Sequence, residues 1–303
     1  MDLSIIIPSY NTKKLTVGCV KSVIKNTRGI NFEMIVVDNG STDASLEAVR
    51  KLQISARAPT SLLKPELQII KNGENLGFAG ANNKGIIRSK GKYVLFLNSD
   101  ILIHDNVLSE MVDWMERNPR VGIATCGLKN KNGSVQETGG YFPTLLRVFS
   151  WMIVQDLPLV DRVIKPFHPK ENFYQNEREL DWVTAAFMMV RREVVKNRVW
   201  DEDYFMYTED VDYCFRAKNG GWKVMYLPQW KITHFGGASG TKEKTVLREY
   251  EGVKTFYKKH YSKWQYPVLR ILLKIGALGR MLVLGILNGR TEFKIYAKAF
   301  WRA

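Results

Sequence analysis

Short apolar runs alternate with helix-like stretches through the first 125 residues of the chain. Apolar runs that end in polar or glycine-containing clusters are typical of buried strands. Strands that alternate with helices predict a parallel sheet with helices on its faces. The runs place the predicted strands at residues 3–7, 34–37, 67–70, 93–97 and 121–126.

Polar clusters follow three of these predicted strands. The ligand of an open α/β sheet binds outside the carboxyl ends of the strands, so clusters at three such ends predict one shared cleft. The clusters are Pro8-Ser9-Tyr10-Asn11, Asp38-Asn39-Gly40-Ser41 and Asn98-Ser99-Asp100.

The second half of the chain is less regular. Glycine and asparagine between residues 129 and 141 predict a hairpin, whereas residues 142–179 lose their periodicity and are too long for a simple connection. We expect that segment to be a substrate loop or a partly mobile stretch. Regular structure is predicted again at 182–190, as a helix at 209–218, as strands at 223–227 and 231–233, and as a long helix at 243–261.

Composition indicates a globular protein. The 303 residues are 45% hydrophobic and 25% charged, which suits one large domain or a domain with an appendage. Cys19, Cys126 and Cys214 are far apart and form no CxxC pair, so neither a disulfide framework nor a zinc site is predicted. Three dispersed cysteines favour a protein that works in a reducing compartment. Because the first residues enter a predicted strand without a signal-peptide pattern, we expect the protein to stay in the cytoplasm.

Positive charge is concentrated near the end of the chain. There are 45 Lys and Arg against 30 Asp and Glu, a net charge of +15. From Lys254 onward there are 11 basic residues and one acid, Glu292, so 10 of the 15 excess charges lie in the last 50 residues. Such a charge favours nucleic acid, phosphate-rich ligands or an anionic membrane as a partner.

Six motifs follow one another along the chain: IIIPSYN, VVDNGSTD, NLGFAGANN, FLNSD, WVTAAFMMVRRE, and YTEDVDYCFRA followed by ITHFGG. With these motifs, from about Leu3 to Gly237, the chain resembles family 2 glycosyltransferases, in particular bacterial rhamnosyltransferase-like enzymes of cell-surface polysaccharide assembly. The resemblance implies a GT-A fold, an α/β mixed sheet flanked by helices. It implies a catalytic domain at residues 1–240, with a nucleotide-binding part at 1–125 and an acceptor part at 126–240. The residues beyond this domain are expected to form a basic, amphipathic helical extension at 241–303.

The resemblance also implies a divalent metal site. Asn98-Ser99-Asp100 looks like the family's DxD motif with Asn in place of the first Asp, which leaves Asp100 as a metal ligand and Asn98 as a hydrogen-bonding partner of the donor. His234 stands where the family completes the site, and imidazole beside carboxylate and phosphate oxygens suits Mn²⁺ better than Mg²⁺. The alternatives are a simple turn at residues 98–100 and a structural histidine.

Three acids open the predicted helix at 209–218. By resemblance to the family's xED motif, Asp210 is the general base for the acceptor hydroxyl, and Glu209 orients the acceptor or the base. Acids also suit a helix N-terminus, so capping is the alternative. Asp212 points to another helix face and is expected to pair with Arg216 at i+4. Trp182 is expected to floor the acceptor pocket, with a core tryptophan as the alternative.

The nucleotide pocket is assigned by the same resemblance. Asp38 would accept a hydrogen bond from N3–H of a uracil or thymine ring, with a helix cap as the alternative. Tyr10 could stack on the base, and Gly77 could allow a close backbone approach. The full set of expected pocket residues is Pro8, Ser9, Tyr10, Asn11, Asp38, Asn75, Gly77, Phe78, Asn82, Asn98 and Asp100.

The last predicted segment is apolar and basic. Residues 267–287 are long enough to cross a bilayer, but Arg270, Lys274 and Arg280 interrupt them, and the longest uncharged stretch is nine residues. Spanning requires about 20 apolar residues, so a helix lying in the membrane interface is expected. Basic residues then recur every four positions beside aromatic ones, which is typical of a helix on anionic lipid: Arg290, Lys294, Lys298 and Arg302. The alternative is a helix pair packed on the catalytic domain or on a sister subunit, which would make a homo-oligomer.

Together these features predict an inverting, metal-dependent enzyme that transfers a single sugar. The expected donor is dTDP-rhamnose or a UDP-sugar, the acceptor a glycan or a polyprenyl-diphosphate-linked sugar, and the location the inner face of the cell membrane. A dinucleotide-dependent oxidoreductase fails because no GxGxxG follows the first strand. No zinc-finger or RNA-binding signature supports a nucleic-acid partner. The remaining alternative is a non-catalytic relative of the same fold that binds nucleic acid or membrane.

Overall fold

One mixed sheet of nine strands organises the part of the chain that the structure describes, which is residues 1–56, 66–154, 164–195, 200–236 and 240–303 of a computed structural model. One half of this sheet consists of four parallel strands, in the spatial order β3 (Glu66–Lys71), β2 (Phe32–Asp38), β1 (Leu3–Ser9) and β4 (Tyr93–Leu97). The predicted α/β class with a mixed sheet is therefore confirmed.

The other half of the sheet changes direction. β10 (Phe187–Arg191) runs antiparallel to both of its neighbours, β4 and β6 (Val121–Lys129). β11 (Lys223–His234) pairs parallel with β6 and antiparallel with two short strands, β5 (Ile101–Leu102) and β8 (Arg178–Leu180). The pairing with β5 brings the end of β11 next to the turn that follows β4.

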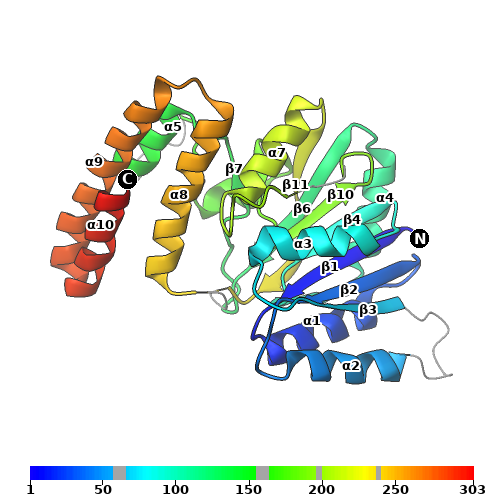
Figure 1. The fold of residues 1–303 in the computed structure, drawn as a ribbon. Coiled ribbons are helices and arrows are strands. Elements are labelled where there is room, and N and C mark those ends of the chain that lie inside the picture. Colours follow the sequence, from blue (N-terminus) through cyan, green and yellow to red (C-terminus); the bar gives the residue numbers. More distant parts are fainter. Residues whose placement is uncertain (57–65, 155–163, 196–199, 237–239) are drawn as a thin grey trace.

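Helices cover both faces of the sheet (Figure 1). In β1, Leu3 and Ile5 belong to one apolar core, whereas Ile6 belongs to the other, because successive side chains of a strand point to opposite faces. A strand buried on both sides must be apolar at nearly every position, which explains the run in the sequence. The first core includes α1 (Lys13–Asn26), α2 (Ser45–Ala56) and α4 (Val107–Arg117), and the second includes α3 (Gly77–Arg88) and α7 (Glu209–Asn219).

The predicted strands at 223–227 and 231–233 form a single strand, β11, in the structure, so the prediction of two strands was wrong. The pairing of β11 with β6 shifts register between Leu227 and Lys231. Pro228 lies in this interval and has no N–H to donate, so the hydrogen bonding of the strand is interrupted there. The sequence prediction took this interruption for a break between two strands. The predicted helices at 209–218 and 243–261 correspond to α7 and α8 (Lys242–His260) and are confirmed.

The segment between β6 and β10 contains several short elements. The predicted hairpin is reduced to a turn closed by a bridge between Lys129 and Val135, after which β7 (Gly139–Gly140) pairs with β9 (Trp182–Val183) in a small second sheet. Residues 142–179, expected to be irregular, include α5 (Leu145–Phe149), η1 (Ser150–Val154) and η2 (Glu171–Gln175). Residues 155–163 of that expectation lie outside the described residues.

Three helices at the end of the chain form a group on one side of the molecule (Figure 1). They are α8, α9 (Gln265–Asn288) and α10 (Arg290–Arg302). One face of α9 packs on the rest of the protein: Leu269, Leu273 and Ala277 are buried, and a Cβ on Gly276 would lie 2.6 Å from Met152 of η1. By length and composition, α9 is also the one helix of the described residues that could cross a membrane.

Candidate active site

Two adjoining cavities lie where the predicted polar clusters meet. The strand-end cavity has a volume of about 480 Å³ and is lined by the residues that follow β1 and β4. The acidic cavity has a volume of about 450 Å³ and is lined by five carboxylic acids, Asp100, Glu137, Glu209, Asp210 and Glu249. Asn98, Asp100 and Phe78 line both cavities, so the two spaces are contiguous at the end of β4. The single cleft predicted from three strand ends therefore has two compartments.

The strand-end cavity contains most of the residues predicted for the nucleotide pocket. Of these, the structure places Pro8, Ser9, Tyr10, Asn11, Asn75, Gly77, Phe78, Asn98 and Asp100 in its wall.

Two predicted pocket residues, Asp38 and Asn82, are not among those lining the strand-end cavity. Asp38 ends β2, is buried, and lines a separate small space, and neither of its carboxylate oxygens has a hydrogen-bond partner among the described residues. Asn39, its neighbour, lines the cavity instead. Asn82 is buried in α3 and donates to the carbonyl of Phe78 at 3.0 Å. The roles assigned to Asp38 and Asn82 stay predictions.

Gly77 permits a close contact within the chain itself. Its φ of +73° lies in the region that favours glycine, and an added Cβ would lie 2.5 Å from the carbonyl oxygen of Phe205. The next residue, Phe78, donates its N–H to that same carbonyl at 3.0 Å. Gly77 thus joins the start of α3 to the loop before α7, and both segments border the two cavities.

Asp100 and His234 lie side by side, as the motifs predicted. His234 ends β11 and pairs with Ile101 of β5, which places its Nε2 3.2 Å from Oδ1 of Asp100. Gln136 fixes the ring, because its Oε1 lies 2.7 Å from His234 Nδ1 while its Nε2 donates to Asn130 at 2.7 Å. An amide oxygen only accepts, so Nδ1 carries the proton, and the lone pair of Nε2 faces Asp100 when the imidazole is neutral.

This pair fits one side of a divalent metal site. A carboxylate oxygen and an imidazole nitrogen are ligands that Mn²⁺ accepts. A metal-binding histidine usually donates a hydrogen bond from its other ring nitrogen, for example to a carbonyl oxygen, as His234 does to Gln136. No group of three or more His, Cys, Asp or Glu side chains that could hold a metal occurs in the described ranges. Gln136 carried no sequence signal that identified it.

Glu209 and Asp210 begin α7 at the edge of the acidic cavity. Asp210 accepts hydrogen bonds from the N–H of Ala185 at 3.3 Å and of Val211 at 2.9 Å. Burial raises the pKa of Asp210 to about 6, although these N–H groups oppose the shift. Glu209 is only 5% exposed, and burial together with the charge of Asp210 raises its pKa well above the usual range. Burial therefore favours the protonated form of both adjacent carboxyls, and at Asp210 the two N–H groups oppose it.

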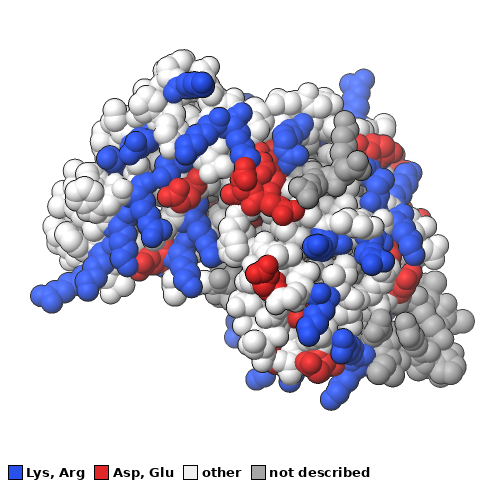
Figure 2. Space-filling view, viewed as in Figure 1, with Lys and Arg blue, Asp and Glu red and all other residues white. Residues whose placement is uncertain are grey.

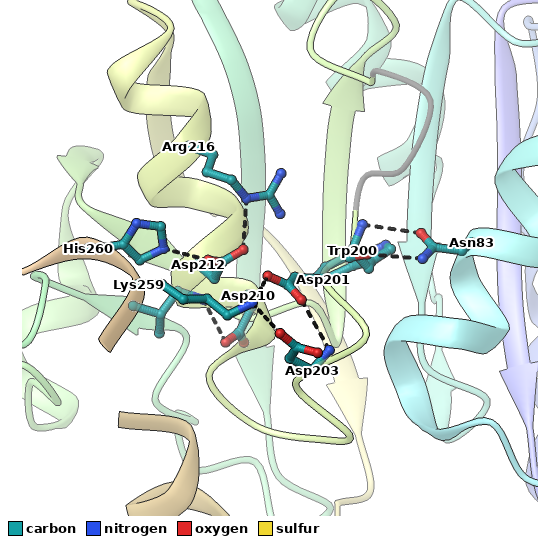
Figure 3. Close-up of polar contacts among 10 residues, drawn as sticks. Asn83, Trp200, Asp201, Asp203, Asp210, Asp212, Arg216, Lys259 and His260 are labelled. Carbon is teal, nitrogen blue, oxygen red and sulfur yellow. Dashed lines mark hydrogen bonds and ion pairs between the residues drawn. The ribbon is translucent and has the colours of Figure 1, made fainter. Parts of the chain in front are cut away.

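A polar network holds the first turn of α7 (Figure 3). Asp212 accepts from Arg216 Nε at 2.8 Å, which confirms the predicted i+4 pair, and it also contacts His260 Nε2 of α8 at 2.6 Å. Lys259, which precedes His260 in α8, lies 2.5 Å from a carboxylate oxygen of Asp201 and 2.5 Å from one of Asp203. The contact of Asp212 with His260 holds α7, and with it Asp210, against α8, and Lys259 joins α8 to the loop that precedes α7. The contribution of α8 was missed because it depends on residues 48 or more positions apart.

Aromatic residues form part of the wall of the acidic cavity. Trp182 is 8% exposed, lines this cavity, and packs edge-on against His168, with ring centroids 5.5 Å apart. Its expected role in the acceptor pocket stays a prediction. His168 was not predicted as a site residue. Its Nε2 lies 2.9 Å from Oε1 of Glu249 in α8. The segment containing His168 was predicted only in general as a substrate loop.

α8 borders both cavities. Lys244 and Arg248, one turn apart, line the strand-end cavity, whereas Thr245 and Glu249 line the acidic cavity. Arg248 also lies over the ring of Phe205, 4.6 Å from its centroid. The strand-end cavity is therefore lined by two cations, whereas no Lys or Arg is found among the described residues that line the acidic cavity.

Known proteins share this sequence pattern. Residues 4–198 match the family model described as "Glycosyl transferase family 2". The chain is 24% identical over 264 residues to N-acetylglucosaminyl-diphospho-decaprenol L-rhamnosyltransferase of Mycobacterium tuberculosis, covering 80% of this chain and 79% of that protein. It is 30% identical over 173 residues to rhamnosyltransferase WbbL of Escherichia coli, covering 54% of this chain and 62% of that protein.

Solved structures share the fold. Mannosyltransferase PcManGT from Pyrobaculum calidifontis, in complex with GDP-Man and Mn²⁺, matches 98% of this chain and 78% of its own with a TM-score of 0.59 and 15% identity. S. aureus TarS 1–349 in complex with UDP-GlcNAc matches 99% of this chain and 79% of its own with a TM-score of 0.57 and 18% identity. The expected GT-A fold is confirmed.

Proposed function

Because this chain belongs to glycosyltransferase family 2, and is thus a sugar-transferring enzyme, we propose that it moves one sugar from a nucleoside diphosphate to a hydroxyl group with inversion. The observation that carries the proposal is the pair of contiguous cavities of opposite character that meet at Asp100. One cavity suits an anionic donor and the other an uncharged acceptor. The reacting atoms would meet at their junction.

The strand-end cavity is proposed to bind the donor. Tyr10 is 46% exposed at its wall and offers a flat ring to a base. Lys244 and Arg248 supply positive charge for a diphosphate. Asp100 and His234 would hold Mn²⁺ or Mg²⁺. When bound, such an ion neutralises charge on the diphosphate leaving group.

The proposed sugar and base follow the relatives. Two similar proteins are named as rhamnosyltransferases, and two similar structures contain GDP-Man or UDP-GlcNAc. We propose L-rhamnose from dTDP-rhamnose, or a sugar from a UDP-sugar. The acceptor would be a glycan or a polyprenyl-diphosphate-linked sugar of cell-surface polysaccharide synthesis.

Asp210 is proposed to act as the general base. Its carboxylate takes the proton of the acceptor hydroxyl while that oxygen forms a bond to the anomeric carbon. The bond from the anomeric carbon to the diphosphate breaks, and its electron pair leaves with the diphosphate. Burial favours the protonated form of Glu209, and in that form its carboxyl can donate a hydrogen bond to the acceptor. A single displacement inverts the anomeric carbon. An NMR coupling constant showing the donor's own configuration in the product would contradict this step.

The outer face of α9 is proposed to lie on an anionic membrane. The charges that interrupt this helix turn toward the protein: Arg270 donates to the carbonyl of Ala303 at 2.9 Å, and Arg280 to that of Trp151 at 2.7 Å. Lys274 lies 5.5 Å from the centroid of the Phe300 ring. The opposite side, here called the apolar face of α9, is exposed at every third or fourth residue: Val268, Ile271, Ile275, Leu278, Leu282 and Ile286.

Basic side chains gather on the same group of helices. Figure 2 shows Lys and Arg gathered over the group of α8, α9 and α10. Each basic residue near an anionic surface contributes about 1 kcal/mol, and apolar burial adds a part that salt does not remove. We therefore place the enzyme at the inner face of the cell membrane, where a lipid-linked acceptor would be within reach.

A donor screen tests the proposed function. The purified full chain is mixed with Mn²⁺ and individual dTDP-, UDP- and GDP-sugars, and its melting temperature and sugar-nucleotide hydrolysis are measured. We expect stabilisation and hydrolysis with one class of donor and loss of both in excess EDTA. Full turnover in EDTA would exclude the metal, and no response to any donor would exclude the proposed donor site.

A further inference from the structure

His168 projects into the acidic cavity from a tightly packed aromatic setting. Its ring centroid lies 4.0 Å from that of Phe167, 5.3 Å from Trp151 and 5.5 Å from Trp182. Packing against three rings from different segments restricts the orientation of the imidazole. The side chain keeps 19% of its surface exposed, and it belongs to the cavity wall together with Asp210.

α8 holds the same imidazole from the other side. Oε1 of Glu249 lies 2.9 Å from Nε2 of His168, and the carboxylate is 26% exposed. Glu249 stands between two buried residues of α8, Leu247 and Tyr250, so its backbone position is fixed by the core. The ion pair therefore connects the cavity wall to a packed helix and differs from a mobile surface pair.

The charges facing His168 are almost all negative. Besides His168, the titratable side chains that line the acidic cavity are Asp100, Glu137, Glu209, Asp210, Glu249, His234 and Tyr207. Burial alone would lower the pKa of His168, but its hydrogen bond to Glu249 and the charges of Glu249, Glu137 and Asp210 raise it above the ordinary value. The positive charge of His168 in turn opposes the effect of burial on the pKa of Asp210.

We propose that His168, kept positively charged by Glu249, is a positioning residue that maintains Asp210 as an ionised base for the acceptor hydroxyl. This inference rests on the proposed function of Asp210. The imidazole does not exchange a proton with the substrate. It supplies a positive charge to a cavity whose carboxylates favour a protonated Asp210, and so acts in the same direction as the N–H groups of Ala185 and Val211. Glu249 acts through His168, so α8 takes part in acceptor activation.

The pH dependence of kcat/KM distinguishes this role from a merely structural one. His168→Gln keeps a side chain that can hydrogen-bond to Glu249 but removes the charge. We expect the acidic limb of the profile to move upward by about one pH unit, which is a tenfold loss on that limb, with nearly normal activity at high pH. Glu249→Gln should move the limb in the same direction, and the double variant should resemble His168→Gln.

Matched controls are His104→Gln and Glu251→Gln. His104 bonds to Thr233 outside both cavities, and Glu251 is an exposed residue of α8 that pairs with Lys254. Neither should shift the profile. Equal loss at all pH values in His168→Gln, or no loss, would overturn the proposal. If His168→Gln fails to fold, Glu249→Gln decides by the same criterion. Asp210→Asn is measured in parallel, because its retention of activity would refute the proposed base and not the role of His168 alone.

Discussion

Asp210 and Glu209 are adjacent in sequence, yet their surroundings differ. Asp210 receives two backbone N–H groups, whereas Oε2 of Glu209 is buried without a hydrogen-bond partner among the described residues. We expect Asp210→Asn to lower kcat by about 10²–10⁴-fold, the usual effect of losing a general base, while donor affinity stays nearly unchanged. Single-turnover kinetics and donor titration measure the two quantities. If Asp210→Asn keeps most of its activity while Glu209→Gln is inactive, the base is Glu209.

The raised pKa of Asp210 gives a second prediction. A base works only when deprotonated, so activity is present above the pKa and lost as the pH falls through it. Since burial raises this pKa to about 6, kcat/KM of the wild-type enzyme should fall on the acidic side near that value. A pH series in constant ionic strength measures the limb. A profile that stays flat well below this pKa would contradict the assignment.

Among the elements, α8 yields a prediction about donor binding. Arg248 lines the strand-end cavity and is fixed over Phe205, so it is placed to meet a diphosphate. Hydrogen bonds to charged groups contribute about 1.5–3 kcal/mol, so Arg248→Ala should raise the donor KM by about tenfold or more with little change in acceptor KM. Lys258→Ala, a basic residue of α8 that lines neither cavity, is the control. An unchanged donor KM would remove Arg248 from the donor site.

The apolar face of α9 gives a prediction about location. Leu278, Leu282 and Ile286 are exposed, so changing all three to Ser should leave the fold intact and remove the salt-resistant part of binding to anionic vesicles. Ile87→Ser, an exposed apolar residue of α3, is the control. Flotation of vesicles at low and high salt measures the effect. Unchanged flotation would exclude the membrane, and a shift from dimer to monomer would identify the face as an interface between copies.

The sequence predicted elements better than their contacts. β4 was predicted with its observed bounds because its apolar run is as short as a buried strand and is bounded by polar residues. β11 was predicted as two strands because Pro228 interrupts the apolar pattern, although the strand continues past it in the structure. Motifs indicated Asp100, His234 and Asp210, but Gln136 and His168 belong to no motif. They reach the site through contacts with partners 81 or more residues away, which local patterns cannot reveal.

For the whole molecule, the division of charge predicts acceptor preference. The chain has a net charge of +15, yet its acidic cavity is surrounded by five carboxylic acids and lacks Lys and Arg among the described lining residues. Placing like charges together costs several kcal/mol. The kcat/KM for a neutral acceptor sugar should therefore be about tenfold or more higher than that for the corresponding uronate. A matched pair of glycosides that differ only in CH₂OH and carboxylate provides the measurement. Equal rates would show that the acceptor binds elsewhere.

α8 presents Lys244 and Arg248 to one cavity and Thr245 and Glu249 to the other, all within about two turns of one rigid helix. In a chimaera with a related enzyme, exchange of this helix would replace the α8 residues of both cavities at the same time. Donor and acceptor preferences could not be recombined independently by swapping that segment. An altered acceptor preference with an unchanged donor would instead require point substitutions on the side of α8 that bears Glu249.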